Sequence, residues 1–269
     1  MKMESSDQVC SNMEEHNFQD WTVRYRSSHI LPSKCTDNCK SGNTECTFCR
    51  YNHELNLTHL PEMVFPNNIL QLVHKSGCSV EFNAFDALKL VKSENMNVKI
   101  SCAETWKRAR EDTGLVERTV GDFDWTFQTN YKGTFSNLDV HDSEVGIDME
   151  KLRQKEEILL YRNLTLFEDE LHDNGIAVCS VRIRVMPSGF FILLRYFLRV
   201  DNVIIVVNDS RIYHDFTTDY IILETAQREN KVSDLRVPIG VMNEPDEVTP
   251  LLALKSSKCQ KLVIPKCDL

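Results

Sequence analysis

The sequence has few glycines and none of the short motifs that mark common enzyme classes. Nine of its 269 residues are glycine, so little of the backbone could approach a phosphate group closely. A glycine-rich phosphate loop, a His-Glu-x-x-His zinc motif and a Gly-x-Ser-x-Gly elbow are all absent from the sequence. We therefore predict a protein that is not an enzyme.

Long apolar segments are also missing. The longest apolar runs, FFILL (190–194) and VIIVV (203–207), have five residues each, far fewer than the roughly 20 that span a bilayer. Acidic residues interrupt the first 20 positions, where a secretory signal would need an apolar stretch. We expect a cytoplasmic protein that does not bind membranes, with its ten cysteines reduced.

The charge balance argues against nucleic acid as a partner. The formal net charge is -9, and a surface of that sign repels a phosphate backbone. Hydrophobic residues make up 42% of the chain, which is ordinary for a globular protein with a buried core.

The chain divides into a short tail and one domain. Residues 1–17 are polar and without pattern, so we predict a disordered N-terminus followed by a single domain over 18–269. From 31 to 59 all periodicity is lost, and Ser, Thr, Asn, Gly and Cys accumulate. That composition indicates a cysteine-rich insertion in loop conformation.

The body of the domain has the pattern of long hairpins. Strands are expected on both sides of the Asn-Gly pair at 174–175 and of the Asp-Asn pair at 201–202. Apolar spacing predicts a helix after Asn83 and a longer helix over 146–164, capped by Asp148. Hairpins with one apolar face need a second layer to cover it. We predict an α+β fold in which largely antiparallel β-sheets form a two-layer core with flanking helices.

Four cysteines are concentrated in one short stretch. Cys35, Cys39, Cys46 and Cys49 form the pattern Cys-x3-Cys-x6-Cys-x2-Cys. Zinc prefers four tetrahedral thiolate or imidazole ligands, and Cys-x2-Cys is a standard half-site. The gap of six residues is shorter than the roughly 12 to 20 of common zinc fingers and ribbons. The segment is either a zinc-binding interaction module or a loop in which thiols have accumulated without a metal. We expect no cofactor other than the zinc that this cluster could bind.

Arginines alternate along two predicted strands. Arg182 and Arg184 share one face of SVRIRV, and Arg195 and Arg199 recur in LLRYFLR. Because guanidinium groups form paired hydrogen bonds with carboxylates, these arginines could line a groove for an acidic peptide tail or a C-terminal carboxylate. The alternative is cross-strand pairing with the acids at 168–170. If the strand continues, Glu168, Glu170 and His172 share one face and could hold a divalent metal, or form a solvated face.

Several long strings in the body resemble the TIPRL family. They include EFNAFDAL, DWTFQTNYKGT, LFEDELHDNG and VRIRVMPSGFFILLRYFLRVDNVIIVVNDSRIYH, in the family's order. The family comprises regulators of TOR signalling that bind the catalytic subunits of type 2A protein phosphatases. The resemblance therefore implies a non-enzymatic regulator that modulates the activity or assembly of such serine/threonine phosphatases. It also implies an antiparallel β core and a groove that receives the phosphatase's C-terminal tail.

The resemblance further implies four phosphatase-binding positions: Asp86, Ile147, Val207 and Asp209. The two carboxylates could pair with basic groups of the partner, and the two apolar side chains could serve as anchors. Each could instead be structural, as a helix acid, a hydrophobic staple, a core residue and a turn residue respectively. Val207 departs from the methionine that the family usually carries there. The cysteine-rich stretch has no counterpart in the family pattern, so the resemblance implies no role for it.

Overall fold

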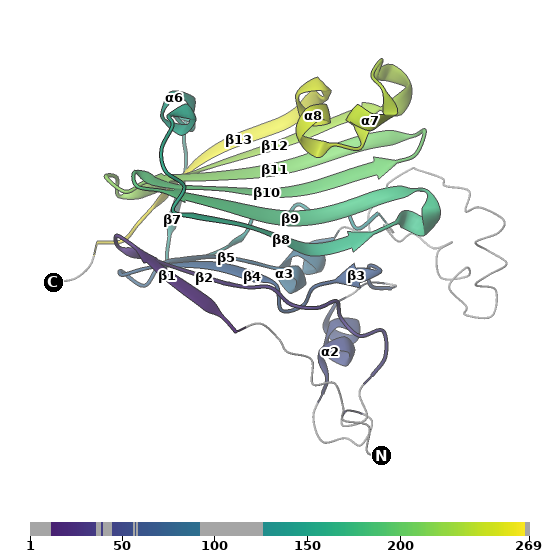
Figure 1. Cartoon of the computed structure of the whole chain (residues 1–269), viewed down its shortest axis with the longest axis horizontal. Coiled ribbons are helices and arrows are strands. Elements are labelled where there is room, and N and C mark those ends of the chain that lie inside the picture. Colours follow the sequence, from purple (N-terminus) through teal and green to yellow (C-terminus); the bar gives the residue numbers. More distant parts are fainter. Residues whose placement is uncertain are drawn as a thin grey trace.

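Two antiparallel β-sheets stacked face to face form the framework of the protein (Figure 1). The computed structural model describes residues 12–35, 39, 45–55, 57, 59–91 and 126–266. The small sheet has the strand order β1 (Glu14–Phe18), β2 (Trp21–Arg26), β4 (Ile69–His74), β5 (Ser79–Asn83) and β6 (Thr134–Ser136). The large sheet has the order β3 (Met63–Val64), β8 (Leu160–Asp169), β9 (Gly175–Met186), β10 (Gly189–Val200), β11 (Ile204–Asp215), β12 (Tyr220–Lys231), β13 (Ala253–Val263) and β7 (Asp139–Asp142). The predicted α+β class with a two-layer antiparallel core is confirmed.

The long hairpins of the large sheet form where their turns were predicted. Gly175 opens β9 with φ 150°, and a Cβ there would lie 1.9 Å from the carbonyl oxygen of Arg199. Only glycine fits so close to the neighbouring strand. Asn202 turns β10 into β11 with φ 60°, a left-handed conformation that asparagine tolerates well.

The main core lies between the two sheets. Alternate residues of β10, namely Phe190, Ile192 and Leu194, point toward the small sheet and are at most 2% exposed. The Trp21 ring of β2 meets the Phe190 ring edge-on, with 5.3 Å between centroids. Because successive strand residues point to opposite faces, the other half of β10 faces outward, away from the small sheet.

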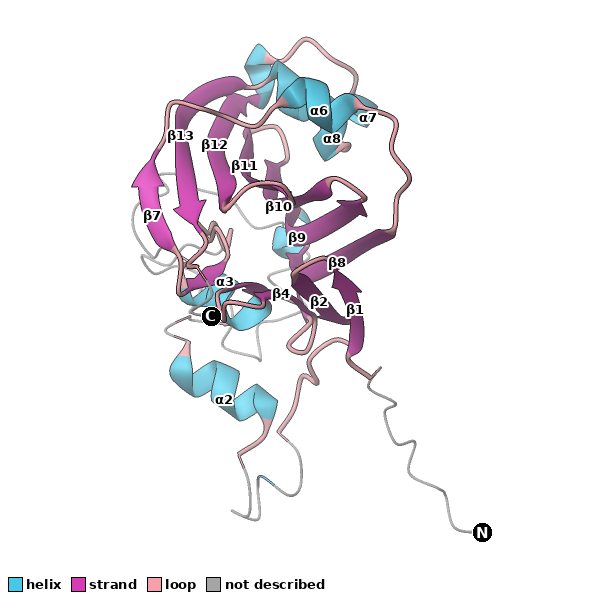
Figure 2. Cartoon of the chain, turned by 90° about the vertical axis from the view of Figure 1, so that its left-hand side faces the viewer, coloured by secondary structure: helices cyan, strands magenta, loops and turns pink. Residues whose placement is uncertain are grey.

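Short helices cover parts of that outer face (Figure 2). They are α6 (Met149–Arg153), α7 (Ile239–Met242), α8 (Pro245–Val248) and the 3-10 turns at Val232–Asp234 and Thr249–Leu251. The chain then returns as β13, which inserts between β12 and β7. The described residues include no helix that is long and apolar enough to cross a membrane.

The predicted N-terminal disorder is wrong for residues 14–17, which belong to β1. Among the described strands it pairs with β2 alone, and its polar side chains form bonds along that edge, such as Glu15 with Arg24 at 2.7 Å. An edge strand exposed to solvent carries no alternating apolar signal, so composition could not reveal it. Residues 1–11 lie outside the described residues.

Two helix expectations also need correction. The predicted loop over 31–59 contains α2 (Thr47–Glu54), whose Tyr51 is buried. The helix expected over 146–164 is only α6, because the chain is extended at Gln154 and enters β8 at Leu160. Sheet pairing has overridden the local helical spacing there. The cap at Asp148 is confirmed, as is the cap at Asn83 of α3 (Ala84–Lys89).

Candidate functional site

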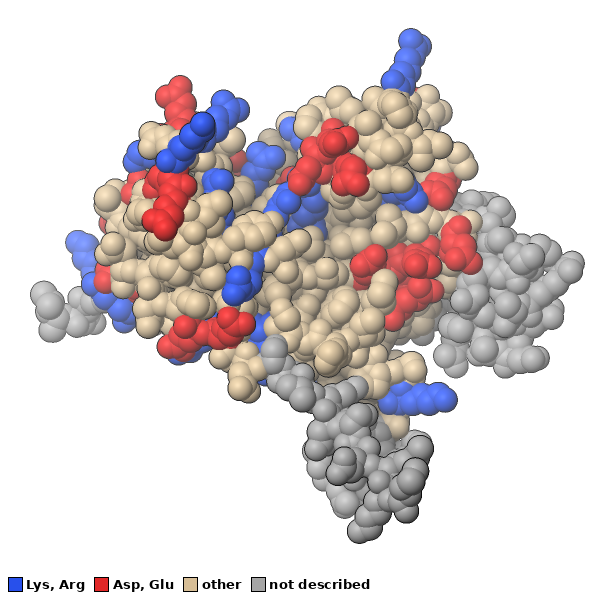
Figure 3. Space-filling view, in the orientation of Figure 1, with Lys and Arg blue, Asp and Glu red and all other residues tan. Residues whose placement is uncertain are grey.

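A groove crosses the outer face of the large sheet, between α6 on one side and α7 and α8 on the other (Figure 3). It consists of three adjoining pockets of about 220, 290 and 170 Å³. Arg211 lines the first two, and Arg195 and Asp246 line the first and third. We call this surface the outer groove, defined by Arg182, Leu193, Arg195, Asp209, Arg211, Glu224 and Asp246. Figure 3 shows lysine and arginine side chains gathered along the hollow.

The floor of the outer groove holds a buried ion pair. Arg195 and Asp209 face each other across β10 and β11. Their two hydrogen bonds measure 2.6 Å from Nε and 2.7 Å from Nη2, and the side chains are 9% and 4% exposed. Burial opposes the charged form of Arg195, but the hydrogen bonds and negative charges of Asp209 and Asp246 together outweigh burial, so the pKa of Arg195 is raised. This paired geometry is the strongest that the two side chains can form.

A second carboxylate joins the floor to the C-terminal helices. Asp246 of α8 accepts a hydrogen bond from Arg195 at 2.7 Å and from Arg182 at 2.9 Å. The hydrogen bond from Arg182 is the main reason that the pKa of Asp246 is lowered. Asp246 therefore holds α8 against β9 and β10 and forms one wall of the outer groove.

The centre of the outer groove carries an accessible cation. The Arg211 side chain is 40% exposed, and its Nη2 lies 3.9 Å from the Asp209 carboxylate. Across the sheet Arg211 faces Glu224, whose Oε1 accepts a hydrogen bond from the Ile147 backbone at 2.7 Å. Glu224 thus anchors the segment before α6, and Arg211 presents donors to whatever enters the groove.

The structure brings three of the four predicted phosphatase-binding residues to the outer face. Ile147 lies with Tyr213 and Ile222 in a small apolar cluster on the α6 side. Val207 is fully buried in another cluster, beneath α7 and α8. Asp209 lies between them on the floor of the outer groove.

Asp86 is not part of this group. It lies in the first turn of α3, which is on the other side of the large sheet from α6 to α8 (Figure 1). Its carboxylate accepts hydrogen bonds from Thr134 at 2.5 Å and from Asn83 at 3.1 Å. Asp86 therefore belongs to a separate surface.

All four predicted arginines lie on the outer face, but their partners differ from those considered from sequence. Arg195 and Arg182 bond as described above, Arg199 pairs with Asp201 at 2.9 Å, and Arg184 donates to the Leu152 carbonyl at 3.1 Å. The alternative of pairing with the acids at 168–170 is wrong, because the described partners of these arginines lie elsewhere. Asp169 instead accepts from the backbone of Glu62 and Leu171, and burial raises its pKa to about 7.

The acids at 168–170 and His172 do not form a metal cluster in the described part of the chain. The strand β8 ends at Asp169, and the backbone turns through positive φ at residues 171–173. The common strand face on which that possibility depended is therefore not formed.

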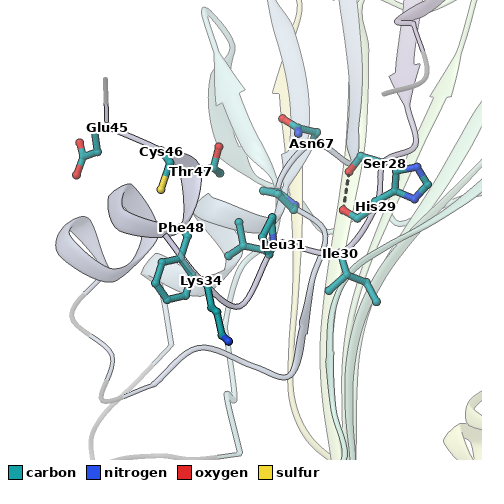
Figure 4. A pocket seen from close by; sticks show the side chains of 12 residues that line it. Ser28, His29, Ile30, Leu31, Lys34, Glu45, Cys46, Thr47, Phe48 and Asn67 are labelled. Carbon is teal, nitrogen blue, oxygen red and sulfur yellow. Dashed lines mark hydrogen bonds between the residues drawn. The ribbon is translucent and has the colours of Figure 1, made fainter. Parts of the chain in front are cut away.

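The four cysteines do come together. The Sγ atoms of Cys35, Cys39, Cys46 and Cys49 all lie within 4.8 Å of one another, and they are the one such cluster among the described residues. The pKa of the Cys49 thiol is raised, chiefly by its hydrogen bond with Cys35. Beside the cluster, Cys46 and Phe48 of the α2 start face Leu31 across a pocket of about 320 Å³ (Figure 4).

Comparison with known proteins shows to which family the chain belongs. The sequence model of the TIP41-like family matches residues 63–236. The chain belongs to the TIP41-like family. It is 40% identical over 254 residues to a human TIP41-like protein, covering 93% of this chain and 89% of the relative. It is 35% identical over 237 residues to the type 2A phosphatase activator TIP41 of Saccharomyces cerevisiae, covering 81% of this chain and 64% of the relative. A protein of the same description from Schizosaccharomyces pombe is 29% identical over 232 residues, covering 84% of this chain and 87% of the relative.

The residues that match the TIP41-like family include every residue that defines the outer groove except Asp246, which follows the matched range. The four-cysteine cluster precedes that range. Sequence reasoning missed Arg211, Glu224 and Asp246 as groove residues. Arg211 could have been predicted from the sequence, because it follows Asp209 by two positions in the same strand and must therefore share its face of the sheet.

Proposed function

We propose that this TIP41-like protein binds the catalytic subunits of type 2A-like serine/threonine phosphatases and modulates their activity or assembly in TOR signalling. In this proposal it acts in the cytoplasm by binding and does not itself catalyse a reaction. Two relatives are described as type 2A phosphatase activators, and that description supports the class of partner.

The observation that carries the proposal is the charge of the outer groove. Five cationic and four anionic side chains line its three pockets, whereas the whole chain has a net charge of -9. Asp209 and Asp246 are already neutralised by Arg195 and Arg182, and Lys258 pairs with Asp142 at 2.8 Å. Arg211 and Arg228 are then left to meet an incoming negative charge. A groove with that balance suits an extended acidic segment or a terminal carboxylate, such as the tail of a phosphatase catalytic subunit.

The buried site residues then have supporting roles. Ile147 and Val207 hold the two walls of the outer groove in place through their apolar clusters. Asp209 fixes the orientation of Arg195, which in turn holds Asp246. Asp86 would make a second contact with the phosphatase, on the surface formed by α3.

Replacing Arg211 by alanine tests the groove. Affinity for a purified phosphatase catalytic subunit should fall by about tenfold or more, since a hydrogen bond to a charged group contributes about 1.5–3 kcal/mol. A phosphatase without its C-terminal residues should bind wild type and variant equally. Binding would be measured by titration calorimetry at constant ionic strength.

Arg24→Ala is the matched control. Arg24 is 41% exposed, close to the 40% of Arg211, but lies on β2 of the small sheet. Its replacement should leave affinity unchanged. If both variants bind as wild type does, the groove is not the tail site; if wild type itself captures no catalytic subunit, the proposed function is wrong.

A further inference from the structure

The sulfur atoms of the four-cysteine cluster all lie within 4.8 Å of one another. Cys49 is 3.4 Å from Cys35, Cys39 is 3.6 Å from Cys49, and Cys46 is 3.9 Å from Cys35. A zinc ion with four thiolates at about 2.3 Å requires neighbouring sulfurs about 3.8 Å apart. A disulfide would require about 2.05 Å. The observed distances match the first arrangement and not the second.

The same distances restrict the cluster to a single metal ion. In a polynuclear iron–sulfur centre, inorganic sulfides and several irons separate the cysteine ligands, so the cysteines must stand farther apart than around one ion. All four sulfurs here lie within 4.8 Å of one another. Thiolate-only tetrahedral sites favour zinc among the common divalent ions.

The local fold explains how two of the ligands are placed. Cys46 is the N-cap of α2 and Cys49 lies three residues later, so both sulfurs lie at the start of this helix. Cys35 comes from the segment after Leu31, which is tied to β3 by a hydrogen bond from its backbone to Val64 at 2.7 Å.

The cluster also has a structural consequence for α2. This helix has eight residues, too few to be stable in isolation. Its Tyr51 packs edge-on against Phe85 of α3, and its Arg50 lies 4.8 Å above the same ring. A metal that fixes both the start of α2 and the preceding segment would hold this helix against α3.

We propose that Cys35, Cys39, Cys46 and Cys49 bind one structural Zn²⁺ ion, which holds α2 against α3. The site lies outside the range that the family model matches and apart from the outer groove. The zinc proposal can therefore be tested independently of the phosphatase proposal.

Metal analysis of the full chain, purified without a histidine tag and under reducing conditions, tests the site directly. About one zinc per chain is expected. Because a structural zinc site needs four ligands and Cys46→Ser with Cys49→Ser removes two of them, the double variant should retain less than about a tenth of the zinc. Cys259→Ser, a change to a half-buried thiol on β13 outside the cluster, should retain all of it.

A second measurement does not depend on whether the double variant folds. Hydrogen exchange of the wild-type chain, before and after a zinc chelator, should show loss of amide protection in α2 with β10 and β11 unchanged, and recovery when Zn²⁺ is returned. Wild-type protein that lacks zinc and takes up none when Zn²⁺ is added would overturn the proposal. Stoichiometric iron, two disulfides in the freshly purified chain, or unchanged protection of α2 after zinc removal would also overturn it.

Discussion

Removing the negative charge of Asp209 should destabilise the protein strongly. In Asp209→Asn the side chain keeps its shape, but the amide nitrogen faces a guanidinium nitrogen, donor against donor, inside a site that is 4% exposed. Breaking a buried pair from one side costs about 3–5 kcal/mol. Because Asp246 still accepts a hydrogen bond from Arg195, we expect a loss near the lower limit, about 3 kcal/mol in the free energy of unfolding.

Urea unfolding followed by tryptophan fluorescence measures this loss, since Trp21 lies in the core between the sheets. The midpoint should fall with no change in the slope. Asp20→Asn is the control, because Asp20 pairs with Lys75 at 2.8 Å while both side chains are more than half exposed. That change should cost less than about 1 kcal/mol. Equal costs for the two variants would refute the reasoning that burial, and not bonding distance, sets the effect.

Three further outcomes follow from other parts of the structure. Asp86→Asn should weaken capture of the phosphatase catalytic subunit in a pull-down with little change in melting temperature; unchanged capture would remove Asp86 from the contact. Asp169, whose pKa is raised to about 7 by burial, stays protonated when folded at a pH where the unfolded chain has lost the proton, so stability should fall as pH rises from about 4 to about 7. Asp169→Asn should flatten that part of the stability curve, and an unchanged curve would contradict the assignment. Gly175→Ala should cost clearly more than 1 kcal/mol in urea unfolding because the added Cβ meets the Arg199 carbonyl, whereas Gly240→Ala, with nothing within 4 Å, should be near neutral; similar costs would argue against the close approach.

Local chemistry was enough to predict most of the large sheet. Alternation and turn residues located β9, β10 and β11. Each of these strands is long and has an apolar face, and the turns between them contain residues that accept positive φ. The segment over 146–164 shows the limit of such reasoning. Its spacing of Leu152 and Leu159 suits a helix, yet the chain gains more by pairing Leu160 with Val185 in the sheet.

The candidate site was predictable in part for the same reason. Strand alternation placed the four arginines on one face, and cysteine spacing anticipated a cluster at 35–49. The partner that organises the groove could not be found this way, because Asp246 is 51 residues from Arg195 in the chain. A contact between distant segments depends on how α8 packs on the sheet, and that information is not local.

The insertion of β13 between β12 and β7 has a consequence for the newly made chain. Until β13 has been synthesised, one edge of β12 is unpaired and β7 lacks its partner strand. The contact between Asp142 of β7 and Gln260 of β13 joins residues that are 118 positions apart in the chain. Open edges and late long-range closure expose a chain to aggregation and to chaperone binding. A shortened product that stops before residue 253 would never close this sheet, and its expected fate is rapid degradation.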